Sequence, residues 1–151
     1  MTTIPTPARA LTPYICCKGA AQAIDFYKQV FGALETMRLA EPSGRIGHAE
    51  LRIGDDALML ADEYPDMGIR SPLAFEGTAV TLHLYVADVD AVVARAVAAG
   101  AKVLREVQDQ FYGDRSGTIV DPFGHRWLIG TRKEVLSAEQ VGQRYRDMMK
   151  G

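Results

Sequence analysis

Cysteine is scarce in this chain, and the placement of its two cysteines argues against a disulfide framework. Cys16 and Cys17 are adjacent. Neighbouring side chains on a strand point to opposite faces, so such a pair rarely forms a bridge. No CxxC spacing suggests a zinc or redox motif. We therefore expect two reduced thiols with a structural role.

Long apolar runs and an excess of basic residues are also missing. No run approaches the roughly 20 apolar residues that a membrane helix needs, and residues 1–10 lack the apolar segment of a signal peptide. The net charge is −2, whereas nucleic-acid-binding proteins usually carry a basic excess. These absences predict a cytoplasmic protein that binds neither nucleic acid nor a membrane.

The composition that remains is that of an ordinary folded domain. Of the 151 residues, 48% are hydrophobic and 24% are charged, which excludes a disordered chain. A chain of this length buries a core without staples. Residues 1–10 hold two prolines and three threonines and predict a mobile N-terminal tail.

Hydrophobic periodicity predicts one strand, one helix and three further strands in residues 11–63. Ala20, Ile24, Tyr27 and Phe31 recur at the spacing of one helix face, and Gly32 follows where a helix should end. The predicted helix covers residues 20–31. The predicted strands cover residues 12–17, 34–40, 46–53 and 57–61.

The same order repeats after a linker at residues 64–79, which is rich in proline and glycine. Residues 80–132 predict a strand, a helix that begins at Asp88 and ends before Gly100, and three strands. We expect those strands at 80–86, 102–107, 117–120 and 125–131, with a turn at 113–116. Ser137 and Gln140 form a capping box for a C-terminal helix within residues 133–151.

Four segments make the chain resemble the vicinal-oxygen-chelate superfamily, which contains glyoxalase I, bleomycin-resistance proteins and extradiol dioxygenases. They are residues 24–32 (IDFYKQVFG), 54–60 (GDDALML), 86–90 (VADVD) with the pair at 99–100, and 121–125 (DPFGH). Residues 12–14 (TPY), 111–115 (FYGDR) and 121–127 (DPFGHRW) resemble its PhnB-like branch. The resemblance covers residues 11–132 as one domain.

The resemblance implies an α+β fold in which two tandem βαβββ modules form an eight-stranded mixed-sheet cup, with the helices outside and the C-terminal helix added. Alternation along the strands then directs one set of apolar residues toward the helices: Ala49, Leu51, Ile53, Leu58, Leu60, Leu82, Leu84 and Val86. It directs a second set into the cup: His48, Glu50, Met59, Thr81, His83 and Tyr85. Family members commonly dimerise, so a homodimer is expected.

Metal-dependent members of the family place one ligand, chiefly His or Glu, on each of four strands. The matching positions in this chain are Thr12, Met59, Thr81 and Leu128, none of which is a good ligand for a divalent metal. The resemblance therefore predicts that the usual metal site is absent, and it implies no firm cofactor. The alternative is a divalent metal held at a displaced site by His48, Glu50 and His83.

The histidines are the candidate catalytic residues. His48 and His83 are expected to face the cup, where a histidine that titrates near neutrality can act as a general base. The alternative is that both are polar wall residues with hydrogen bonds inside the cup. His125 follows a turn glycine and is expected to belong to the turn or to the start of the next strand.

Other side chains are expected to bind a ligand in the cup. Tyr14 and Tyr85 can stack on a flat molecule or simply pack half-buried, and Arg126 can hold a carboxylate or a phosphate or form a solvated salt bridge. Tyr112 and Arg115 belong to a segment expected at the cup mouth or in a capped turn. The complete set is Tyr14, Glu50, Met59, Thr81, Tyr85, Tyr112, Arg115 and Arg126.

Three functions remain open at this point. The first is a metal-free protein that binds a small organic molecule in the cup, as resistance proteins do. The second is an enzyme: a lyase, isomerase or dioxygenase whose metal acts as a Lewis acid on vicinal oxygens, or a metal-free enzyme with a histidine base. The third is a dimeric domain without a working site.

Overall fold

The computed structural model describes residues 3–5 and 9–151, and the chain divides into two compact units, Met1–Ser71 and Pro72–Gly151. Each unit contains one four-stranded mixed sheet and is described by itself. The predicted mobile tail falls partly on residues 1–2 and 6–8, which lie outside the described residues. No helix of the described part is long and apolar enough to cross a membrane.

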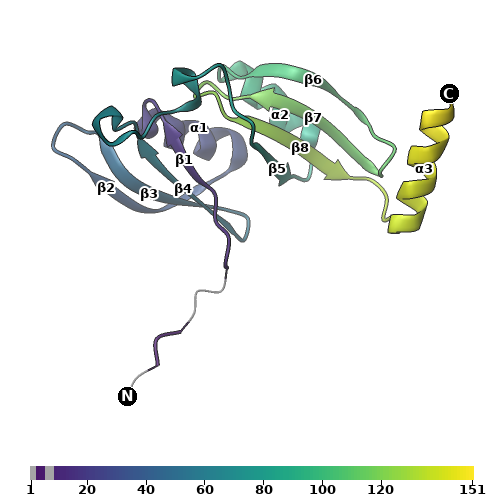
Figure 1. Cartoon of the computed structure of the whole chain (residues 1–151), viewed down its shortest axis with the longest axis horizontal. Coiled ribbons are helices and arrows are strands. Elements are labelled where there is room, and N and C mark those ends of the chain that lie inside the picture. The colour runs from purple at the N-terminus through teal and green to yellow at the C-terminus, as the bar shows by residue number, and fades with distance from the viewer. Residues whose placement is uncertain (1–2, 6–8) are drawn as a thin grey trace. The chain divides into compact units, whose positions relative to one another are not determined.

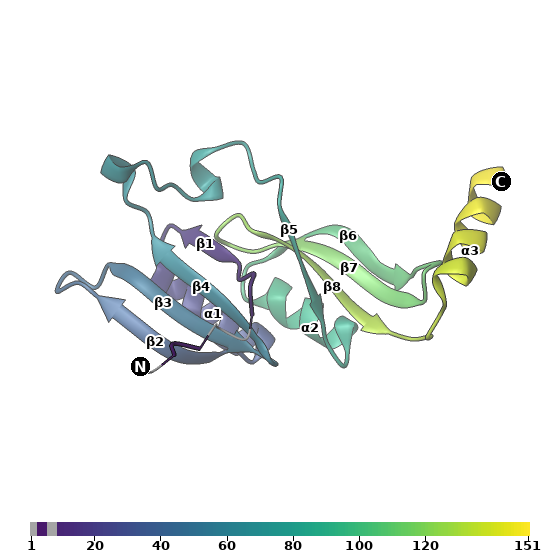
Figure 2. The ribbon, with the colours of Figure 1, turned by 60° about the horizontal axis from the view of Figure 1, so that its bottom comes forward.

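The first unit has the order strand, helix and three strands (Figure 1). Its elements are β1 (Tyr14–Cys17), α1 (Ala20–Phe31), β2 (Leu34–Ala40), β3 (Ile46–Ile53) and β4 (Asp56–Asp62). The sheet order is β1-β4-β3-β2, with β1 parallel to β4 and the other pairs antiparallel. The helix covers one face of this sheet (Figure 2), and Ile24, Tyr27 and Val30 on α1 are fully buried.

A carboxylate on β4 holds the start of α1. The helix begins after Gly19, which has a φ of 95° and no side chain to cap it. Asp62 takes over this role, because its Oδ1 accepts from the Gly19 and Ala20 amides at 3.0 and 2.8 Å. Its Oδ2 accepts from the Ile46 amide at 2.7 Å. The bonds from Gly19 and Ala20 satisfy donors that a helix N-terminus leaves without intrahelical partners, while the bond from Ile46 ties the same carboxylate to β3.

The second unit repeats this plan. Its elements are β5 (Thr81–Tyr85), α2 (Val89–Ala98), β6 (Lys102–Asp109), β7 (Asp114–Val120), β8 (Arg126–Arg132) and α3 (Ala138–Lys150). The sheet order is β5-β8-β7-β6, with β5 parallel to β8. Asp88 caps α2 through a bond from the Ala91 amide. The Thr131 hydroxyl accepts from the Val89 amide at 2.9 Å and donates to the Val86 carbonyl at 3.0 Å.

The turn between β7 and β8 is built around a buried carboxylate. Asp121 accepts hydrogen bonds from the Phe123 and His125 amides and from the Trp127 indole N–H, all between 2.9 and 3.0 Å. Trp127 is 4% exposed. Trp127 is thus a core residue, and the prediction that His125 belongs to this turn is confirmed.

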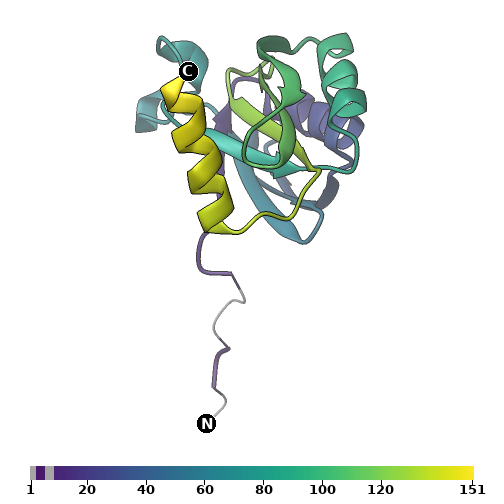
Figure 3. The same cartoon turned by 90° about the vertical axis from the view of Figure 1, so that its right-hand side faces the viewer.

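The C-terminal helix α3 is the yellow helix of Figure 3. It begins with the capping box that was predicted from Ser137 and Gln140. None of its described residues is buried. Arg144 anchors it by pairing with Glu134 and by donating to the Phe111 carbonyl.

The predicted fold class is confirmed: the chain is α+β, with two βαβββ modules and a C-terminal helix. The eight strands form two four-stranded sheets, and their joining into one cup stays a prediction. The turn predicted at residues 113–116 is wrong, because β7 begins at Asp114 and pairs with β8 from Arg132 onward. The linker contains two 3₁₀ turns, η1 (Pro65–Met67) and η2 (Pro72–Ala74).

Candidate functional site

Three predicted site residues lie side by side on the first sheet. The strand register pairs Tyr14 with Met59 and Met59 with Glu50. Their neighbours Leu58, Leu60 and Leu51 are buried on the opposite face, the face that α1 covers. Tyr14, Met59 and Glu50 therefore lie on the face away from the helix, as alternation predicts.

A hydrogen-bond chain links Tyr14, His48 and Glu50 on this face. The Tyr14 hydroxyl lies 2.7 Å from His48 Nδ1, and His48 Nε2 lies 3.1 Å from Glu50 Oε1. If the Glu50 carboxylate accepts from Nε2–H of a neutral His48, then Nδ1 accepts from the Tyr14 hydroxyl. Burial, and after it the charges of Glu50 and Cys16, raises the pKa of Tyr14. A histidine oriented in this way can move a proton.

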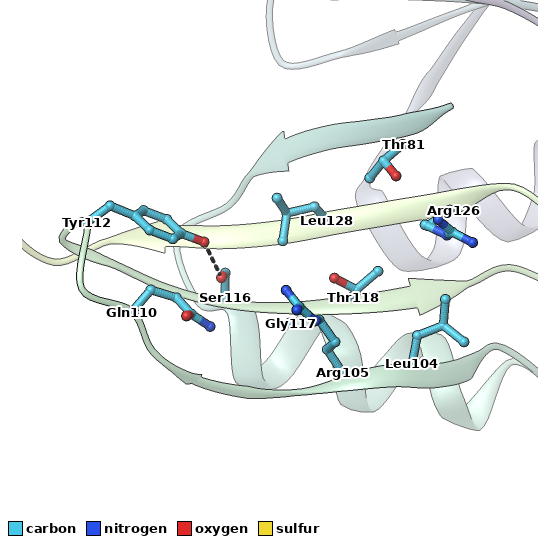
Figure 4. Close-up of a pocket in the computed structure, with 10 residues that line it drawn as sticks. All are labelled: Thr81, Leu104, Arg105, Gln110, Tyr112, Ser116, Gly117, Thr118, Arg126 and Leu128. Atoms are coloured by element: carbon cyan, nitrogen blue, oxygen red, sulfur yellow. Dashed lines mark hydrogen bonds between the residues drawn. The ribbon is translucent and has the colours of Figure 1, made fainter. Parts of the chain in front are cut away.

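The second sheet carries a cavity of about 440 Å³ on the face away from α2 (Figure 4). Three predicted ligand-binding residues line it together: Thr81, Tyr112 and Arg126. Leu128, the last of the four family metal positions, lines it too. The remaining lining residues were not expected: Leu104, Arg105, Gln110, Ser116, Gly117 and Thr118.

Strand register explains how the cavity is assembled. Thr81 pairs with Arg126 across β5 and β8, and Thr118 pairs with Leu128 across β7 and β8. The Tyr112 hydroxyl and Ser116 Oγ lie 3.0 Å apart and mark one end of the cavity, while Arg126 lies at the other end (Figure 4).

Two of the unexpected lining residues come from an irregularity in β6. The pairing of β6 with β7 shifts register between Val103 and Arg105, and again between Arg105 and Gln108. Such a shift breaks the strict alternation of faces. As a result, the neighbours Leu104 and Arg105 both reach the cavity.

His83 and Tyr85 belong to a separate network on the second sheet. The Tyr85 hydroxyl donates to Asp114 Oδ2 at 2.6 Å, and this bond is the main cause of the raised pKa of Tyr85. The guanidinium of Arg132 lies over the Tyr85 ring, 5.1 Å from its centroid. The His83 ring lies 4.6 Å from that of Tyr85. The two predicted residues are thus neighbours, but neither lines the 440 Å³ cavity.

Arg115 lies elsewhere. It pairs with Asp90 of α2 at 2.8 Å and with Asp109 at 3.1 Å, so its side chain is directed toward the helix. Both carboxylates raise the pKa of the Arg115 guanidinium. Arg115 does not line the cavity, because its side chain is held by Asp90 and Asp109, whereas its neighbour Ser116 points to the other face of β7 and lines the cavity.

The residues at the four family metal positions do not fit a divalent metal. Thr12 and Thr81 offer only hydroxyls and Leu128 a hydrocarbon side chain, while Met59 offers only a soft thioether. Among residues 3–5 and 9–151, no group of three or more His, Cys, Asp or Glu side chains is arranged to hold a metal. His48 and Glu50 belong to the first unit and His83 to the second, so a displaced metal site made of all three stays a prediction. Both ring nitrogens of His48 already have partners in Tyr14 and Glu50.

Comparisons with known proteins agree with this fold. The model of the Glyoxalase/Bleomycin resistance protein/Dioxygenase superfamily matches residues 9–129. The protein Rv0887c of Mycobacterium tuberculosis is 44% identical over 135 residues, which cover 87% of this chain and 79% of the relative. The solved structure of At5g48480 from Arabidopsis thaliana is 28% identical, with a TM-score of 0.63 and coverage of 83% of this chain and 98% of that one.

The PhnB protein from Bacillus cereus is similar in fold alone. It is 18% identical, with a TM-score of 0.66 and coverage of 82% of this chain and 99% of the other.

Proposed function

Because the chain belongs to the Glyoxalase/Bleomycin resistance protein/Dioxygenase superfamily, we propose that it binds a small organic molecule in the cavity on its second sheet. The observation that carries this proposal is the cavity itself, of about 440 Å³ and lined by both polar and apolar side chains. Binding sites for small molecules commonly measure about 300–1,000 Å³ and combine an apolar lining with a few polar groups.

The chemistry of the lining supports binding without a metal. Leu104 and Leu128 offer apolar surface, and the hydroxyls of Thr81 and Thr118 offer hydrogen bonds. Tyr112 adds an aromatic ring at one end. A ligand held here would be oriented by side chains alone.

A screen of small organic molecules tests this proposal. A ligand that binds only the folded protein raises its melting temperature. Leu104→Trp should narrow the cavity. Leu39→Trp is a matched control, because Leu39 and Leu104 are 58% and 50% exposed and each lies on an edge strand of its sheet. We expect compounds whose stabilisation is lost in Leu104→Trp and kept in Leu39→Trp. Compounds that stabilise both variants equally, or a screen without any stabilising compound, would contradict the proposal.

A second candidate function is proton-transfer catalysis on the first sheet, favoured by the Tyr14–His48–Glu50 hydrogen-bond chain. In this function His48 is the base and Glu50 orients its ring. For any compound that the protein converts, His48→Gln should abolish turnover, and Glu50→Gln should reduce it and change its pH profile. Turnover that survives in His48→Gln would exclude this candidate.

The homodimer also remains a proposal, which analytical ultracentrifugation tests.

A further inference from the structure

Arg126 is an arginine whose inner nitrogen is buried without a partner. Its Nε has no hydrogen-bond partner among the described residues. Other arginines of the chain are differently placed: Arg38, Arg45, Arg115 and Arg144 each pair with a carboxylate within about 3 Å. Removing a charged donor from water without a partner costs free energy. The arrangement therefore favours a ligand that supplies the missing acceptor.

The charge of the cavity lining points the same way. Two of its ten residues are arginines, Arg105 and Arg126, and none is acidic. Arg126 also borders an adjoining groove of about 330 Å³, where Glu76 is the acidic lining residue. Glu76 does not accept from the Nε of Arg126 in the described part of the chain, so this donor remains available to a ligand of the cavity.

The sheet fixes where Arg126 is presented. It is the first residue of β8, paired with Thr81 on one side and with Val120 on the other. Two neighbouring strands therefore hold its backbone. Leu128 lies two residues further along the same strand and lines the same cavity. The charged side chain of Arg126 and the apolar side chain of Leu128 thus follow each other along β8, as Figure 4 shows.

We propose that the ligand of the cavity carries an oxyanion, either a carboxylate or a phosphoryl group, and that Arg126 binds this group with help from Arg105. The apolar body of the ligand lies against Leu104 and Leu128. This inference rests on the proposed function and adds the chemical class of the ligand. Arginine suits the task because its planar fork of N–H donors matches the oxygens of carboxylates and phosphates.

Three small aromatic probes test the inference on the full chain: benzoate, phenyl phosphate and benzamide. Benzamide has the size of benzoate but no charge. Ligand-observed NMR titrations give the dissociation constants. We expect benzoate or phenyl phosphate to bind saturably and benzamide to bind at least tenfold more weakly, and the tighter of the two anions identifies the oxyanion. Arg126→Gln should weaken binding of the anion at least tenfold, and Arg126→Lys should weaken it less, because lysine keeps the charge but loses the fork.

Arg52→Gln is the matched control, because Arg52 is an exposed arginine on β3 of the first unit. It should leave binding unchanged, and unchanged melting temperatures would show that the variants fold. Equal binding of benzamide and benzoate, unchanged binding in Arg126→Gln, or no binding of either anion would overturn the inference. In those cases neutral compounds that lose their effect in Leu104→Trp would still support the proposed function, so the two failures are distinguishable.

Discussion

The first and second modules hold their helices in the same place with different chemistry. Asp62 accepts from the Ala20 amide at the start of α1, and Thr131 accepts from the Val89 amide at the start of α2. Thr131 and Val89 each lie 69 positions after their counterparts, Asp62 and Ala20. A charged carboxylate with three amide donors in one module thus corresponds to a neutral hydroxyl with one donor in the other.

The faces away from the helices differ as well. On the first sheet, the polar groups of Tyr14, His48 and Glu50 bind one another. On the second sheet, a cavity separates Tyr112 from Arg126, whose Nε has no partner among the described residues. The comparison teaches that the repeated backbone fixes the positions of side chains. The identity of those side chains decides whether the polar groups of a sheet face bind one another or are left to bind a ligand.

The largest expected effect is that of Asp62→Ala. Three amides would lose a carboxylate acceptor, and a hydrogen bond to a charged group contributes about 1.5–3 kcal/mol. Since the site is partly buried and the amides regain some water, we expect a loss of about 3–5 kcal/mol in the free energy of unfolding, measured by urea denaturation. Asp62→Thr places a hydroxyl acceptor there, as Thr131 does in the second module, and should recover part of this loss. A loss below about 1 kcal/mol would show that the carboxylate is not needed.

Cys16 should react slowly with alkylating reagents. Burial, and after it the charges of Glu63 and Asp62, raises the pKa of its thiol to about 11. Because only the thiolate reacts, alkylation by iodoacetamide near pH 8 should be about 100-fold slower than that of a free thiol with the ordinary pKa. The rate should rise about tenfold per pH unit until the pH approaches 11.

Mass spectrometry of the alkylated protein measures this rate, and Cys16→Ser assigns the modified site. Cys17 is fully buried and should stay unmodified in the folded chain. The counterpart of Cys16 in the second module is Tyr85, whose pKa is raised chiefly by its bond to Asp114. Alkylation of Cys16 as fast as that of glutathione would contradict the comparison.

Thr131→Ala tests the second module at the position that matches Asp62. It removes one neutral acceptor and one donor, which should cost about 1–2 kcal/mol in the free energy of unfolding. Thr131→Val keeps the shape and removes the hydroxyl, so it separates the hydrogen bonds from the packing. A cost equal to that of Asp62→Ala would show that charge makes no difference at this position.

Asp88→Ala should have the smallest effect. Asp88 caps α2 with its own side chain, and the loss of such a cap typically costs about 1 kcal/mol. Asp88→Asn keeps a capping oxygen and should be nearly neutral, again by urea denaturation. A larger cost than that of Thr131→Ala would mean that the Asp88 cap, rather than the hydrogen bond between Val89 and Thr131, stabilises the start of α2.

Periodicity in the sequence was sufficient for most of the fold because each helix and strand has its own pattern. Ala20 to Phe31 shows one helical stripe, and the observed α1 has the same bounds. The start of β7 was missed because Gly113 and Asp114 are typical of turns, whereas the pairing of Asp114 with Arg132 decides the structure. Tertiary pairing of this kind is not visible in a local pattern.

The candidate site was predicted only in part for the same reason. Thr81 and Arg126 follow from alternation, and both line the cavity. Ser116 and Thr118 would have followed from a β7 that begins at Asp114, and that strand also places Arg115 on the helix side. Leu104 and Arg105 could not be found by alternation, because the register shift in β6 sends two neighbours to one face.

The parallel strand pairs also set a kinetic condition on folding. In both modules they join residues 45 positions apart, Tyr14 with Met59 and Thr81 with Arg126. The hairpin of β3 and β4, by contrast, brings together Ile53 and Asp56. Closing a longer loop costs more chain entropy before any contact forms. The hairpins should therefore form early, and docking of β1 and β5 onto their parallel partners should limit the rate at which each sheet is completed.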